Sequence, residues 1–181
     1  MKIITSLLAL ALVAFGAPAL AQKVRLATSM GDIVLELDAQ KAPKSVDNFL
    51  RYVKAGHYDG VIFHRVIDGF MIQTGGYKTD LSEKPTRPPI PLEAGNGLSN
   101  LRGAVAMART NDPNSATAQF FINVNDNARL DQAGGGYAVF GKVVDGMDVV
   151  DQIRAVPTRA AGMHGNLPEK TITLKKATLE K

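Results

Sequence analysis

Apolar and polar positions alternate over two neighbouring stretches of the chain, residues 24–28 and 33–37. In each stretch every second side chain is apolar or threonine, which is the period of a β-strand with one buried face. The dipeptide Gly31-Asp32 lies between them and is a turn sequence. The two stretches are therefore predicted to form a β-hairpin.

The period changes to that of an amphipathic helix in the next segment. Apolar residues recur at i, i+3, i+4 and i+7, and they are Val46, Phe49, Leu50 and Val53. Pro43 suits the first turn of a helix and Gly56 suits the position just after its end, so the pattern predicts a helix over about 43–55. A second, shorter helix over 147–153 is expected after the turn at Asp145-Gly146.

Short apolar runs return in the rest of the chain. They cover 61–67, 103–108, 119–124 and 137–144, and Ile172 and Leu174 alternate in a closing strand. Many short strands with two helices predict a mainly β fold, a closed barrel plugged by helices, because closure removes exposed sheet edges.

Two long loops interrupt this pattern. Residues 77–98 hold four of the nine prolines and are predicted to be one loop; a linker between two domains is the alternative, but neither half would then bury a convincing core. The second loop, 126–136, ends in three glycines. No lysine, serine or threonine follows them at the spacing of a phosphate-binding loop, so a flexible loop is predicted.

Residues 1–21 have the layout of a secretory signal peptide. Lys2 precedes a mostly apolar run over 3–15, and Ala19-Leu20-Ala21 gives the small-x-small pattern of a signal peptidase site. We expect cleavage after Ala21, a mature domain over 22–181, and a periplasmic or fully secreted protein. An uncleaved N-terminal anchor is the alternative; no cysteine follows the run, so a lipid anchor is excluded.

Composition narrows the function further. Apolar residues make up 45% and charged residues 21% of the 181, which is typical of a soluble globular protein. Cysteine is absent, so disulfides, thiolate metal sites and cysteine nucleophiles are excluded. Removing Lys2 leaves 20 basic against 17 acidic residues, a net charge of +3, too slight to predict nucleic-acid binding. After cleavage no membrane association is expected.

Candidate chemistry lies in the stretch 63–73. On a continuous strand Arg65 would share a face with Phe63, and with Phe70 and Met71 nearby its guanidinium would lie beside an apolar floor. The alternative is an ordinary exposed arginine on the outer face of the barrel.

Other stretches favour the first interpretation. Residues 107–109 and 115–122, together with 63–76, 100–123 and 137–144, resemble the cyclophilin family of peptidyl-prolyl isomerases, especially its bacterial exported members. The resemblance covers the mature chain in order. It implies an eight-stranded antiparallel β-barrel capped by two α-helices, and cis-trans isomerisation of X–Pro bonds in unfolded or flexible proteins, with no cofactor and no metal.

The resemblance also assigns site residues. It makes Arg65 the catalytic arginine, Gln73 the residue that orients it and His64 a supporting residue. The implied substrate-binding residues are Phe70, Met71, Ala108, Arg109, Gln119, Phe121, Leu130 and Tyr137. Three positions depart from the pattern of animal or other members: Tyr137 replaces a histidine, Arg109 an asparagine, and Arg129 the tryptophan that grips cyclosporin, so weak cyclosporin binding is expected.

Two other classes of function remain as alternatives. A proline-peptide binding module or holdase chaperone would keep the fold with little turnover, and the joint presence of Arg65, Gln73 and Phe121 argues against it. A metal-dependent hydrolase is disfavoured because the histidines are scattered and no Gly-x-Ser-x-Gly elbow occurs. The expected partners are proline-containing polypeptides, and a monomer is expected.

Overall fold

The computed structural model describes residues 22–180, so the expected signal peptide over 1–21 lies outside the described residues. Within 22–180, no helix has the length and apolar character needed to cross a membrane. The elements are β1 Lys23–Thr28, β2 Gly31–Leu37, α1 Pro43–Lys54, β3 Val61–Ile62, β4 Arg65–Ile67, β5 Met71–Thr74, β6 Ala104–Met107, β7 Phe120–Asn123, η1 Ala128–Asp131, η2 Ala133–Gly135, β8 Val139–Asp145, α2 Met147–Arg154, β9 Thr158–Ala161, β10 His164–Pro168 and β11 Thr173–Leu179.

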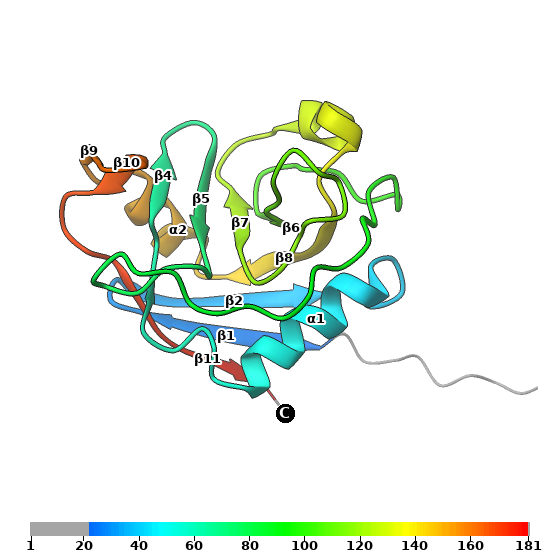
Figure 1. The fold of residues 1–181 in the computed structure, drawn as a ribbon, viewed down its shortest axis with the longest axis horizontal. Helices are drawn as coiled ribbons and strands as arrows, with labels where there is room; N and C mark the ends of the chain where they lie inside the picture. The colour runs from blue at the N-terminus through cyan, green and yellow to red at the C-terminus, as the bar shows by residue number, and fades with distance from the viewer. Residues whose placement is uncertain (1–21, 181) are drawn as a thin grey trace, which may run out of the picture.

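One curled sheet organises the molecule (Figure 1). Its nine strands follow the order β3-β11-β1-β2-β8-β6-β7-β5-β4, and every neighbouring pair is antiparallel. The two end strands, β3 and β4, are consecutive in the chain and separated by two residues. The prediction of a mainly β, antiparallel fold with two helices is confirmed. The sheet was expected to close into a barrel; it is curled, with β3 and β4 at its two ends. This sheet has nine strands where eight were expected, because the run 61–67 forms two strands, β3 and β4.

The break between β3 and β4 corrects one prediction. β3 pairs with β11 whereas β4 pairs with β5, so the chain changes partner at Phe63 and His64. The alternation expected over 61–67 is therefore not continuous. Phe63 donates its N–H to the carbonyl of Ile172, and its side chain is 1% exposed in the inner core. The expectation that Phe63 flanks the Arg65 guanidinium is wrong.

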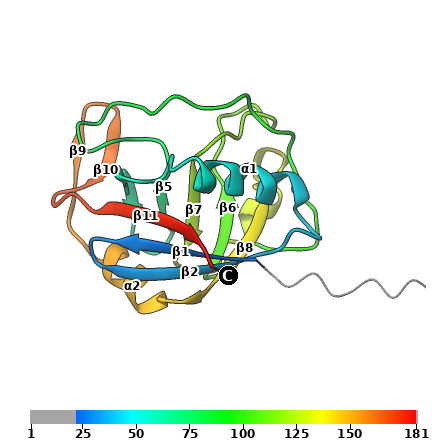
Figure 2. The same cartoon turned by 90° about the horizontal axis from the view of Figure 1, so that it is seen from below.

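Both predicted helices form, and they cover different parts of the sheet (Figure 2). Helix α1 packs against β11 and β8, whereas α2 packs against β2, β5 and β4. Gly56 follows α1 at φ +65°, as its sequence position predicted. Gly146 begins α2 at φ +82°, and a Cβ there would lie 2.2 Å from the Asp32 carbonyl oxygen, so no other residue fits this turn.

Phe49 of α1 lies at the centre of the inner core. Its ring centroid is 5.2 Å from those of Tyr58, Phe120 and Phe140. All four side chains are fully buried. This aromatic cluster fixes α1 against the inner face of the sheet.

The β9–β10 hairpin was not predicted. Its strands are mostly exposed or half-buried, so no apolar period marks them in the sequence. The hairpin packs against β4, which places it beside the candidate site.

The aromatic cluster generates a stability prediction. Replacing Phe49 by alanine should leave a cavity and lower the free energy of unfolding by about 3–5 kcal/mol. Phe70→Ala is the control, because Phe70 is half-buried outside this core and should cost less than half as much. Urea unfolding of both variants measures the difference, and equal costs would contradict the assignment of Phe49 to the centre of the core.

Candidate active site

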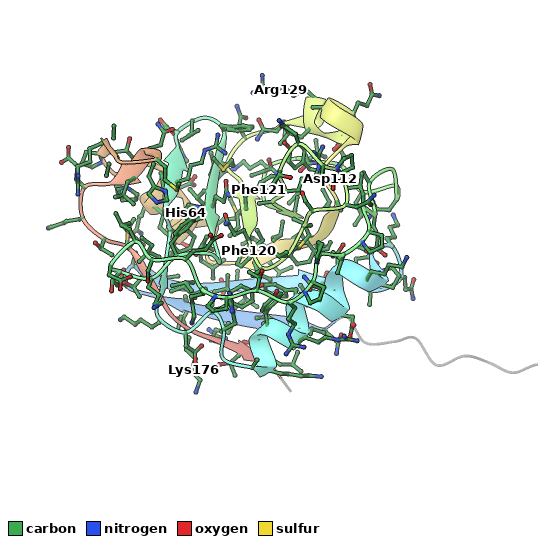
Figure 3. The ribbon with its side chains drawn as sticks, in the orientation of Figure 1. His64, Asp112, Phe120, Phe121, Arg129 and Lys176 are labelled. Carbon is green, nitrogen blue, oxygen red and sulfur yellow. The ribbon has the colours of Figure 1, made fainter. Side chains whose placement is uncertain are left out.

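Strands β6 and β7, beside the candidate site, are buried on both faces. On β7, Phe120 and Ile122 belong to the inner core, whereas Phe121 between them belongs to a second cluster on the opposite face. Phe120 and Phe121 are labelled in Figure 3. The same alternation on β5 and β6 builds this second apolar cluster, which we call the outer cluster. Its buried members are Met71, Ala104, Ala106, Phe121, Leu130 and Val139.

Strand register aligns the key side chains across this outer face. Arg65 on β4 pairs with Gln73 on β5, Gln73 pairs with Phe121 on β7, and Phe121 pairs with Ala106 on β6. A charged group, an amide and an aromatic ring therefore follow one another on adjacent strands. Neighbouring antiparallel strands lie about 4.8 Å apart, so the row brings these groups within reach of one ligand.

A cavity of about 200 Å³ opens over this row. It is lined by Arg65, Phe70, Met71, Gln73, Ala108, Arg109, Phe121, Leu130 and Tyr137. All nine are residues that the sequence assigned to the site. We call this cavity the Arg65 pocket.

A relay of hydrogen bonds orients the arginine. Nη1 of Arg65 donates to Oε1 of Gln73 at 3.2 Å, and Nε2 of Gln73 donates to Oε1 of Gln119 at 2.9 Å. Because a guanidinium can only donate, it fixes which way the Gln73 amide points and therefore the direction of the whole relay. Gln119 thus acts through Gln73 and does not line the pocket. Gly76 leaves room for it, since a Cβ there would lie 2.6 Å from Nε2 of Gln119.

The charge of Arg65 is not neutralised by a neighbour. Its side chain is exposed, and among residues 22–180 no carboxylate forms an ion pair with it. Its remaining N–H groups are therefore available to a ligand whose apolar part fills the pocket beside it.

Arg109 has a structural task that the sequence did not reveal. Its guanidinium donates to the carbonyls of Thr110, Ala133, Gly134 and Gly136 at 2.8–3.1 Å. The cation also lies over the ring of Tyr137, 4.3 Å from its centroid. Arg109 thus binds the glycine-rich loop to the pocket and holds Tyr137 in place, with the Tyr137 ring edge-on to Phe121 at 5.8 Å.

The structure places His64 outside the lining of the Arg65 pocket. It is 4% exposed and packs against Tyr77 and against His164 of the β9–β10 hairpin. Its Nδ1 has no hydrogen-bond partner in the described structure. Burial, and next the nearby His164, lower the pKa of His64 to about 4, so the ring is neutral at pH 7.

Sequence reasoning assigned no role to three buried asparagines next to the pocket, Asn100, Asn123 and Asn127. Asn127 donates to the carbonyl of Phe70 and Asn100 to that of Tyr137, so both touch the backbone of pocket residues. A signal was present, because Asn123 interrupts the apolar run 119–124, and a polar residue in such a run must find a buried partner.

Within residues 22–180, no three histidine or acidic side chains are grouped as metal ligands. His57 is engaged through Nε2 with the Gly75 carbonyl at 3.1 Å.

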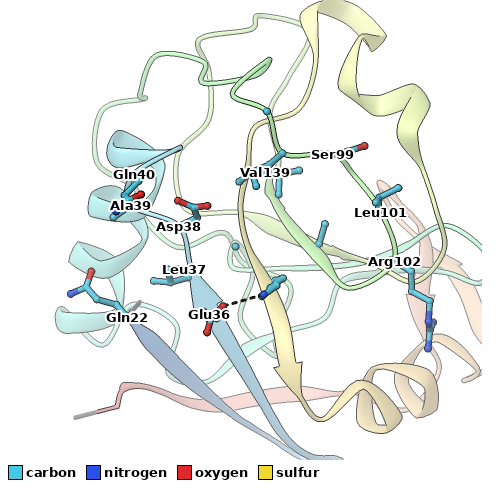
Figure 4. Close-up of a pocket in the computed structure, with 15 residues that line it drawn as sticks. Gln22, Glu36, Leu37, Asp38, Ala39, Gln40, Ser99, Leu101, Arg102 and Val139 are labelled. Atoms are coloured by element: carbon cyan, nitrogen blue, oxygen red, sulfur yellow. Dashed lines mark ion pairs between the residues drawn. The ribbon is translucent and has the colours of Figure 1, made fainter. Parts of the chain in front are cut away.

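A larger cavity of about 900 Å³ lies beside the site (Figure 4). It is lined by the end of β2, by β8 and by the loop that carries Ser99 and Leu101. Its charged groups include Glu36 and Lys142, which form an ion pair at 3.2 Å. None of the sequence-predicted site residues lines this larger cavity. Arg65, Gln73 and Phe121 line the smaller one.

Comparison with known proteins agrees with this geometry. The family model described as cyclophilin-type peptidyl-prolyl cis-trans isomerase/CLD matches residues 23–179. The chain is 56% identical to peptidyl-prolyl cis-trans isomerase A of Dickeya dadantii over 160 residues, 87% of this chain and 84% of that protein. It is 52% identical to peptidyl-prolyl cis-trans isomerase B of Escherichia coli over 157 residues, 84% of this chain and 96% of that protein.

A solved structure has the same fold. The cyclophilin-type isomerase of Cryptosporidium parvum, crystallised in the presence of the dipeptide Ala-Pro, superposes with a TM-score of 0.75 at 29% identity, over 88% of this chain and 99% of that one. The family-model match over residues 23–179 includes β4, β5, β6 and β7, the strands that carry Arg65, Gln73, Phe121 and Ala106. The chain belongs to the cyclophilin family and is a peptidyl-prolyl cis-trans isomerase.

Proposed function

We propose that the Arg65 pocket holds the ring of the substrate proline while Arg65 stabilises the twisted X–Pro amide. The observation that carries this proposal is the position of an exposed guanidinium, without a carboxylate partner, at the edge of an apolar pocket. An apolar ring and a polar amide are adjacent in an X–Pro unit, so one ligand satisfies both parts of the site.

The chemistry requires only rotation about a partial double bond. Resonance between nitrogen and carbonyl creates a barrier of about 18–20 kcal/mol, and unaided X–Pro bonds take tens to hundreds of seconds to interconvert. Rotation is easier when the lone pair is localised on the prolyl nitrogen. An acceleration of about 10⁴ requires about 5–6 kcal/mol of preferential stabilisation of the twisted state.

Arg65 has the means to supply much of this stabilisation. A hydrogen bond from its guanidinium to the prolyl nitrogen strengthens as the nitrogen becomes pyramidal, so it favours the twisted state over either planar isomer. Gln73 and Gln119 hold the donor in place in advance, which reduces the cost of reorganisation. No proton is transferred to the product.

We propose that the substrates are unfolded or flexible polypeptides and that the enzyme assists folding in the periplasm. The pocket is open at the surface, and its side chains would contact only the proline ring and the preceding amide of a substrate. This supports activity on many different polypeptides. The layout of residues 1–21 supports export.

Arg65→Ala should lower kcat/KM by about 10²-fold or more, as the loss of a preorganised donor to a transition state does. Arg65→Lys should recover only part of this loss, because an ammonium lacks the planar fork. The cis-to-trans relaxation of an Ala-Pro-Phe peptide measures the rate, and a peptide titration measures binding.

Arg51→Ala is the matched control, since Arg51 is an exposed arginine of α1 paired with Asp47. It should leave kcat/KM unchanged. Wild-type activity in Arg65→Ala would refute the mechanism. The Arg65→Ala protein is expected to bind the peptide but not to accelerate rotation. A wild-type protein that binds the peptide without catalysing rotation would support the binding-module alternative.

The buried His64 gives a pH dependence of stability. Its folded-state pKa of about 4 lies below the ordinary 6.5, so between these values the unfolded chain binds a proton that the folded chain does not. Stability is therefore lost as pH falls from 6.5 towards 4, by an amount on the order of 3 kcal/mol. Urea unfolding at pH 7 and 4.5 should show a smaller loss for His64→Gln than for the wild type; equal losses would contradict this assignment.

Export also has a direct test. Expressed with its full sequence in a bacterium, the protein should appear in the periplasmic fraction. Its measured mass should be that of a chain that begins at Gln22. A protein retained in the membrane with residues 1–21 intact would favour the uncleaved anchor.

A further inference from the structure

Three buried asparagines and one carboxylate form a directed chain of hydrogen bonds. Nδ2 of Asn127 donates to Oδ1 of Asn123 at 2.8 Å, and Nδ2 of Asn123 donates to Oδ1 of Asn100 at 3.1 Å. Nδ2 of Asn100 in turn donates to Oδ1 of Asp131 at 2.8 Å. We call these four residues the amide chain. Asn100 and Asn123 are fully buried and Asn127 is 7% exposed.

The amide chain contacts the backbone of three pocket walls. Asn127 donates a second bond to the Phe70 carbonyl at 2.7 Å, and Asn100 donates a second bond to the Tyr137 carbonyl at 3.2 Å. The N–H of Leu130 donates to the Asn127 carbonyl at 2.8 Å. Phe70, Leu130 and Tyr137 are thus tied to one buried network although they come from different segments of the chain.

The ends of the amide chain determine its direction. Asp131 accepts from the backbone N–H of Asn100 at 2.8 Å and from the hydroxyl of Ser99. Burial raises the pKa of Asp131, but these hydrogen bonds outweigh it and the pKa lies below its ordinary value, so the group is ionised. An ionised carboxylate only accepts, so every amide must present its oxygen towards Asn127 and its NH₂ towards Asp131. Reversing one amide would leave buried donors unpaired.

We infer that the amide chain is a positioning device that sets the spacing of Phe70, Leu130 and Tyr137, and so the affinity of the pocket for the proline ring. This inference rests on the proposed role of the pocket. The Arg65–Gln73–Gln119 relay shares no hydrogen bond with the amide chain. The two networks therefore act on different quantities: the amide chain on substrate binding, the relay on rotation.

The test changes one hydrogen-bonding group at each end of the amide chain. Asn127→Asp replaces the NH₂ that donates to Phe70 and Asn123 by an oxygen, and Asp131→Ala removes the acceptor at the other end. Each should raise KM, or the dissociation constant of an Ala-Pro peptide, by about tenfold, the equivalent of about one hydrogen bond. Each should change kcat by less than about threefold, which is the opposite of the expectation for Arg65→Ala.

Asp131→Asn should restore binding to within about threefold of the wild type. Its Oδ1 can still accept from Asn100, while its NH₂ can donate to the Ser99 hydroxyl. If Asp131→Asn binds as weakly as Asp131→Ala, hydrogen-bond geometry does not position the walls and the inference is wrong. Should Asn127→Asp not fold, the Asp131 pair decides, since Asp131 is only half-buried.

Asn48→Ala separates positioning from general stability. Asn48 is also a buried asparagine, and its Nδ2 donates to the Thr117 carbonyl, which does not line the pocket. All variants are measured well below their own Tm. Asn48→Ala should lose stability without a change in KM, and a KM increase equal to that of Asn127→Asp would overturn the inference.

Phe121→Ala distinguishes failure of this inference from failure of the proposed binding site. It removes a wall directly and should raise KM. If it does not, the pocket is not the binding site and the proposed function fails; if it does while Asn127→Asp and Asp131→Ala bind normally, only the amide chain's role fails.

Discussion

The two-residue period of the antiparallel strands constrains everything else in this protein. On β5, β6 and β7 one set of side chains fills the inner core and the intervening set builds the outer cluster. A shift of one residue in any of these strands would exchange the two sets, placing Gln73 in the core and a core residue such as Ile72 at the surface. The large inner core thus holds the register on which the small site depends.

Within that register the site combines two environments that are normally kept apart. The outer cluster supplies the apolar surface that we propose holds a proline ring, and β4, at the end of the sheet, supplies an exposed cation. An arginine at the centre of the sheet would need a buried partner, whereas at this edge Gln73 is sufficient to orient it. The position of Arg65 on an end strand therefore explains how its charge stays available for catalysis.

Much of this arrangement could be predicted from the sequence. Periodicity predicted both helices and most strands, and the family resemblance assigned all nine residues that line the pocket. What escaped prediction depends on tertiary contacts. The change of strand partner at Phe63 can be predicted only if the pairing of the strands is known. The exposed β9–β10 hairpin has no apolar period. The hydrogen bonds of Arg109 and of the buried asparagines join segments far apart in the chain.

The central claim is that one pocket binds the X–Pro unit and Arg65 separately accelerates its rotation. Exchange NMR on a proline peptide measures both quantities at once, the rate of interconversion on the enzyme and the dissociation constants of the two isomers. The account predicts that Arg65→Ala slows the bound-state rotation by about 10²-fold or more while the dissociation constants change by less than about threefold. Unchanged rotation on the Arg65→Ala protein, or loss of binding in proportion to loss of rotation, would contradict it.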